Sequence, residues 1–82
     1  MKIIKISAIW CSSCIIMKSR FNEVIKDKDI EVINLDYDLD DIDEYNVGEI
    51  LPVFIKIEND KEVNRLIGEH TKKEIESFVG DL

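Results

Sequence analysis

Near the start of the chain, a β-branched run passes directly into a run with helical spacing, with two cysteines at the junction. Residues 2–8, KIIKISA, are rich in Ile and show no regular polar alternation, which is typical of a strand covered on both faces. From Ser13 to about Asp27, apolar residues recur at spacings of three and four, as on one face of a helix. This order predicts a central parallel strand that leads into a crossover helix.

The segment after this helix predicts two further strands separated by a short acidic helix. Residues 30–35, IEVINL, predict a second strand, parallel to the first because a helix lies between them. Residues 38–45 predict a short helix of weak propensity, because Asp is a poor residue inside a helix. Gly48 ends this segment, and Pro52 opens a third strand at 53–57, VFIKI.

The last third of the chain predicts a hairpin and a closing helix. Residues 58–61, Glu-Asn-Asp-Lys, indicate a turn into an antiparallel fourth strand at 62–67. Thr71 and Glu74 form a capping box that starts an amphipathic helix. We therefore expect an α/β fold of order βαβ-α-ββα, with a four-stranded mixed sheet and helices on both faces, as a single domain over residues 1–82.

Charge and hydropathy narrow the range of partners. The net charge is −7, and nine carboxylates but no Lys or Arg lie between Lys28 and Lys56. Such a surface disfavours nucleic acid and suits a neutral or basic protein partner, or serves only solubility. Lys5 interrupts the apolar N-terminus, and the apolar stretches are too short to span a bilayer. We expect no membrane association, a cytoplasmic location and a monomer.

The motif that carries chemistry is Trp10-Cys11-Ser12-Ser13-Cys14, at the predicted junction of strand and helix. The reactive form of cysteine is the thiolate, which the N-terminus of a helix favours. Cys11 is therefore the predicted nucleophile. Cys14 lies one turn further on and is expected to be less exposed, which suits a resolving thiol that attacks a mixed disulfide on Cys11.

With this motif in place, the chain resembles the thioredoxins, in a short form that lacks their leading strand and helix. The resemblance covers nearly all 82 residues. The family's Trp-Cys-x-x-Cys is matched by residues 10–14, the Asp that closes the next strand by Asp36, and the Tyr before the proline loop by Tyr45. The active-site proline is matched by Pro52, and the Gly before the last helix by Gly68.

This resemblance implies a thioredoxin fold and dithiol–disulfide exchange with protein clients. It implies that the bond before Pro52 is cis and that the Leu51 backbone binds the client chain. Trp10 is either a further client contact or a lid packed over the sheet edge. The resemblance also implies an external electron donor similar to thioredoxin reductase, with no organic cofactor.

The chain departs from the family at three places. Lys5 stands where thioredoxins carry a buried Asp, six residues before the first cysteine. A charged Lys5 close to the thiols would favour thiolate, whereas Lys5 on a solvated face would have no effect. Ser12 and Ser13 replace the usual Gly-Pro, and the spacing from Tyr45 to Pro52 is one residue longer than usual.

Other functions are less well supported by the residues. A glutaredoxin-like, glutathione-dependent reductase would typically carry Thr-Val before the proline, where this chain has Ile50-Leu51. A redox-inert adaptor that keeps the fold and docks a partner through the acidic surface is the alternative from another class. A zinc site would need about four ligands, and beyond the cysteines only His70, expected to be exposed, is available. The acidic run fails as a calcium loop, because Asp41 stands where Gly is required.

Overall fold

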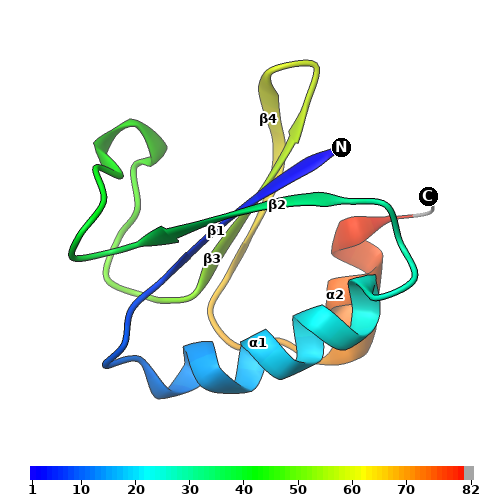
Figure 1. Cartoon of the computed structure of the whole chain (residues 1–82), viewed down its shortest axis with the longest axis horizontal. Coiled ribbons are helices and arrows are strands. Elements are labelled where there is room, and N and C mark those ends of the chain that lie inside the picture. Colours follow the sequence, from blue (N-terminus) through cyan, green and yellow to red (C-terminus); the bar gives the residue numbers. More distant parts are fainter. Residues whose placement is uncertain (81–82) are drawn as a thin grey trace.

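The computed structural model describes residues 1–80, in which four strands form one mixed sheet (Figure 1). The strand order is β2-β1-β3-β4, with β1 parallel to β2 and the other pairs antiparallel, so the predicted sheet is confirmed. In chain order the elements are β1 (Lys2–Ser7), α1 (Ser12–Ile25), β2 (Glu31–Asp36), the 3₁₀ helix η1 (Asp43–Tyr45), β3 (Val53–Glu58), β4 (Lys61–Ile67) and α2 (Lys72–Val79).

Both α-helices pack on the same face of the sheet (Figure 1). Alternate residues of a strand point to opposite faces, so Ile3 of β1 and Phe54 of β3 face the helices. The Phe21 ring of α1 lies 4.6 Å from the Phe54 ring, centroid to centroid. The buried residues of this layer are Ile3, Met17, Phe21, Phe54, Ile75, Phe78 and Val79.

The opposite face of the sheet is covered by the segment that contains η1. Ile4 and Ile6 of β1 and Val53 and Ile55 of β3 point to this face. The partly buried apolar residues that pack on them are Ile33, Leu35, Tyr37, Ile42, Tyr45, Val47 and Ile57. Helical structure thus lies on both faces of the sheet, as predicted. On the η1 face, however, it is a single 3₁₀ turn within a loop.

The acidic helix predicted over residues 38–45 is much shorter than expected. Only Asp43–Tyr45 is helical, because the carboxylates before it bond the backbone locally. Asp36 Oδ1 accepts hydrogen bonds from the amides of Asp38 (2.8 Å) and Leu39 (3.1 Å). Short side chains of this kind compete with helical hydrogen bonding, so the segment folds as a series of turns.

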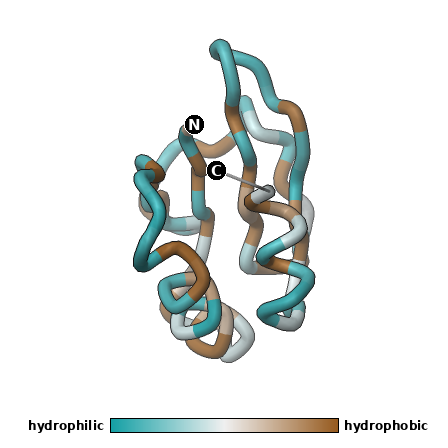
Figure 2. Tube along the Cα trace, turned by 90° about the vertical axis from the view of Figure 1, so that its right-hand side faces the viewer, coloured by the Kyte–Doolittle hydropathy of each residue, from teal (hydrophilic) through white to brown (hydrophobic). Residues whose placement is uncertain are grey.

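The ends of the last three elements follow the predicted turn chemistry. Asn59 and Asp60 have positive φ values of 54° and 62° in the β3–β4 turn, which forms the hydrophilic tip that projects from the body (Figure 2). Thr71 caps α2, since its Oγ1 accepts from the Glu74 amide and its own amide donates to Glu74 Oε1. Within residues 1–80, no helix has both the length and the apolar character to cross a membrane.

Candidate dithiol active site

Cys11 is the N-cap residue of α1, immediately after the turn that leaves β1. Its amide donates to the Ala8 carbonyl (3.2 Å), and its extended backbone (φ −95°, ψ 107°) directs the chain into the helix. Its Sγ accepts a hydrogen bond from the Cys14 amide at 3.2 Å. The sulfur thus caps the helix N-terminus, as a side-chain oxygen usually does. A thiolate accepts such a hydrogen bond more strongly than a thiol does.

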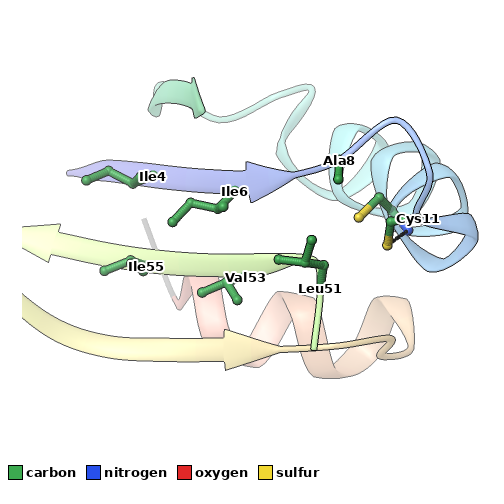
Figure 3. Packing of buried hydrophobic residues seen from close by; sticks show 8 residues of the cluster. Ile4, Ile6, Ala8, Cys11, Leu51, Val53 and Ile55 are labelled. Carbon is green, nitrogen blue, oxygen red and sulfur yellow. Dashed lines mark hydrogen bonds between the residues drawn. The ribbon is translucent and has the colours of Figure 1, made fainter. Parts of the chain in front are cut away.

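Both cysteines are free thiols, and both are buried. The exposed fraction is 8% for Cys11 and 6% for Cys14, so the expected difference in exposure is slight. The pair closes one end of the apolar layer on the η1 side of the sheet, where Cys11 lies beside Ala8 and Leu51 (Figure 3). Little of the Cys11 surface is therefore open to solvent.

The environment of Cys14 holds its proton in the dithiol form. The pKa of Cys14 is raised to about 11, chiefly by burial and also by a hydrogen bond with the Cys11 side chain. The Ala8 backbone and the charge of Lys5 act in the opposite direction. At neutral pH the reduced site therefore keeps a protonated Cys14 behind Cys11.

Lys5 is buried on the helix-covered face of the sheet rather than on a solvated face. Its exposed fraction is 7%, and it lies on the face of β1 that carries Ile3, which is the face that the helices cover. Burial lowers the pKa of Lys5, as does repulsion from Lys18, while Cys14 acts to raise it. The structure thus brings Lys5 and Cys14 within electrostatic reach of each other.

The proline loop lies next to the cysteines. The bond between Leu51 and Pro52 is cis, and both side chains are buried. The Pro52 carbonyl accepts from the Gly68 amide at 2.8 Å. Gly68 has a φ of +84°, and a Cβ there would lie 3.3 Å from Ile50 Cγ2. Gly68 therefore permits both the left-handed backbone and the close approach that hold the loop against β4.

Trp10 is anchored to the segment that follows β2. Its indole Nε1 donates to Asp38 Oδ2 at 2.7 Å, and its ring meets the Tyr37 ring edge-on at a centroid distance of 5.9 Å. The side chain is 59% exposed. Sequence reasoning did not identify Asp38 as a partner, because a contact between residues 28 positions apart leaves no local pattern.

Large apolar side chains adjoin the site in sequence and remain exposed. Ile9 precedes Trp10, Ile15 follows Cys14, and Ile50 precedes Leu51. Their exposed fractions are 91%, 71% and 65%. The segments that carry the two cysteines and the proline therefore present an apolar surface to solvent.

His70 lies apart from the cysteine pair. It is half-buried rather than exposed as predicted, because its ring nitrogens contact neighbouring groups. Nε2 lies 2.8 Å from the Ile67 carbonyl oxygen, and Nδ1 lies 3.4 Å from Glu74 Oε2. In the part of the chain that the structure describes, no group of three or more His, Cys, Asp or Glu side chains is placed to hold a metal ion.

Similar folds occur in solved thioredoxins at low sequence identity. A malaria-parasite thioredoxin-2, described as a component of the parasite's protein secretion machinery, is 17% identical with a TM-score of 0.83, covering 95% of this chain and 79% of that one. A reduced Schistosoma mansoni thioredoxin pre-protein is 24% identical with a TM-score of 0.82, covering 95% and 74%. Thioredoxin 1 of Thermosipho africanus is 22% identical with a TM-score of 0.73, covering 92% and 85%.

Comparison with curated protein sequences finds no match, whereas the family model described as Thioredoxin matches residues 1–81. That match covers nearly the whole chain, and it includes the sheet, both α-helices and the two cysteines. The chain belongs to the thioredoxin family.

Proposed function

We propose that this protein is a thiol–disulfide oxidoreductase that reduces disulfides in protein clients. The observation that carries the proposal is the hydrogen bond from the Cys14 amide to Cys11 Sγ, at the start of α1. This bond places Cys11 where backbone N–H groups stabilise a thiolate and places Cys14 directly behind it. The proposed setting is the cytoplasm, where thiols are kept reduced.

The reaction proceeds by two sulfur displacements. The Cys11 thiolate attacks one sulfur of a client disulfide, which forms a mixed disulfide and releases the first client thiolate. Cys14, once deprotonated, attacks Cys11 Sγ, which forms the Cys11–Cys14 disulfide and releases the second client thiolate. The client gains two electrons and the protein loses them, so turnover requires an external donor similar to thioredoxin reductase.

The exposed side chains beside the site suit an unfolded or extended client segment. Trp10 offers a broad aromatic surface fixed by Asp38, and Ile15 and Ile50, next to Cys14 and Leu51 in sequence, are exposed as well. The proposed client contacts are Trp10 and the Leu51–Pro52 loop, through the backbone of Leu51. The chemistry is carried by the cysteine sulfurs themselves, with no organic cofactor.

Reduction of insulin disulfides by dithiothreitol tests the proposal. We expect the wild-type protein to accelerate insulin precipitation and Cys11→Ser to abolish the acceleration. In a separate incubation without dithiothreitol, Cys14→Ser should accumulate a covalent mixed disulfide with insulin, visible by non-reducing electrophoresis, because no second thiol displaces the client from Cys11. Wild-type activity no greater than that of either variant would reject the catalytic role.

Alkylation separates this function from that of a redox-inert adaptor. A Cys11 thiolate should react with iodoacetamide at neutral pH faster than an ordinary thiol of pKa about 8.5, and Cys14→Ser leaves Cys11 as the single target. An ordinary rate combined with no insulin reduction would favour the adaptor.

A further inference from the structure

Lys5 is the one charged side chain that is buried among the described residues. A buried ammonium group is costly unless an opposite charge compensates it. Within residues 1–80, no salt bridge joins Lys5 to a carboxylate. The burial of the Lys5 ammonium group without a carboxylate partner therefore has to be explained by the other groups near it.

Among residues 1–80, one group near Lys5 can become its counter-ion. Its neighbours in register are Asn34 on β2 and Phe54 on β3, neither of which carries a charge. The charged and titratable groups whose fields act on it are Lys18 and Cys14, both from α1. Lys18 repels the ammonium, so among residues 1–80 the Cys14 thiolate is the group left to pair with it.

The balance of forces on Cys14 changes during the proposed reaction. In the reduced pair, Cys11 helps to keep the proton on Cys14, through a hydrogen bond and, as a thiolate, through its negative charge. In the mixed disulfide, Cys11 Sγ is covalently bonded and uncharged, so the charge contribution is lost and the hydrogen bond is weakened. Burial then remains as the main opposition, while Lys5 and the Ala8 backbone favour the Cys14 thiolate.

We propose that Lys5 is a positioning residue for resolution: its ammonium group stabilises the Cys14 thiolate that displaces the client from Cys11. This inference rests on the proposed function and concerns its second displacement alone. The Cys14 proton leaves to solvent, the Cys11–Cys14 bond forms, and the bond from Cys11 to the client sulfur breaks. The released client thiolate takes the electron pair.

Stopped-flow reaction with the aromatic disulfide DTNB resolves the two displacements. The first coloured thiolate is released when Cys11 attacks, and the second when Cys14 attacks the mixed disulfide. The variants are Lys5→Met, which removes the charge, and Lys5→Arg, which keeps it. Lys61→Met, at an exposed lysine in the distant β3–β4 hairpin, is the matched control, and Cys14→Ser identifies the second phase by removing it.

We expect Lys5→Met to slow the second phase about tenfold at pH 7, as a rise of about one unit in the pKa of the attacking thiol would. The midpoint of its pH profile should move to higher pH. Lys5→Arg and Lys61→Met should remain within about threefold of wild type. The first phase should be similar in all four proteins, since Lys5 acts on Cys14.

Two results would overturn the inference while leaving the proposed function intact: a second phase in Lys5→Met within twofold of wild type across the pH range, or equal slowing in Lys5→Met and Lys5→Arg. The latter would mean that side-chain fit, not charge, matters. If Lys5→Met does not fold, Lys5→Gln provides the neutral variant. A wild-type protein with no second phase beyond that of Cys14→Ser would reject the proposed function and this inference together.

Discussion

Replacing Lys5 by Met removes a charge and keeps an unbranched side chain of similar length, so its effect on folding follows from the burial of the ammonium group. Lys5 is 7% exposed and has no carboxylate partner within residues 1–80. Substitution of such a buried charge by an apolar side chain should stabilise the fold by about 1–3 kcal/mol. With a urea m-value of about 1 kcal/mol per M for a small domain, the unfolding midpoint should rise by about 1–3 M.

The pH dependence of this gain has a definite sign. Burial lowers the pKa of Lys5 from 10.5 in the folded state, so the unfolded chain binds more protons between the folded-state pKa and 10.5. Wild-type stability therefore rises with pH in that window, and the penalty is complete only below it. The advantage of Lys5→Met should shrink as the pH approaches 10.5. Cys14, whose pKa rises from 9.0 to about 11, lowers stability above pH 9.0, so both proteins are compared in a Cys14→Ser background.

The assay is urea unfolding followed by far-UV circular dichroism, with dithiothreitol present, at several pH values from neutral to 10. Lys61→Met should change the free energy of unfolding by no more than about 0.5 kcal/mol, as expected for a surface substitution. A Lys5→Met protein less stable than wild type at pH 7 would refute the reasoning, and so would a gain that does not change with pH.

Three further perturbations test the fold and the site. Phe54→Ala should cost about 3–5 kcal/mol, because it empties the fully buried position against Phe21; a urea midpoint close to wild type would contradict the packing described. Asp38→Ala should shift the fluorescence of Trp10, the only tryptophan, because it removes the 2.7 Å hydrogen bond to the indole. An unchanged spectrum would mean that this contact does not hold the ring in solution. Thr71→Ala should cost about 1 kcal/mol of stability through loss of the α2 cap, measured by thermal unfolding, with no change in DTNB kinetics.

The elements that the sequence pattern predicts well are those whose local preference and burial agree. The first strand, the helix with apolar residues at Met17 and Phe21, and the hairpin turn at Asn59 and Asp60 all lie within one or two residues of their expected bounds. The helix capped by Thr71 is confirmed as well. In each case one face is buried and the turn residues permit the required backbone, so a single arrangement satisfies both.

The acidic segment shows where local reasoning fails. Its charges and Asp content indicate a weak helix. The backbone conformation that it adopts, however, depends on which carboxylates accept hydrogen bonds from backbone amides. Asp36 bonds two amides downstream and Asp40 bonds the Asp36 amide. The same segment supplies Asp38 to Trp10. These hydrogen-bond partners depend on the position of the segment over the sheet, which composition and periodicity do not predict.

The environment of Lys5 could not be predicted for a related reason. A Lys within an Ile-rich strand is compatible with an edge, a solvated face or a buried position, and only the packing of α1 over β1 decides among them. Its burial should make the fold less stable, at a position on β1 whose charge acts on the second thiol. If that charge serves resolution, the two effects of Lys5→Met must be opposite: a more stable protein and a slower second displacement. A variant that gained stability without losing speed would show that the cost and the chemistry are unrelated.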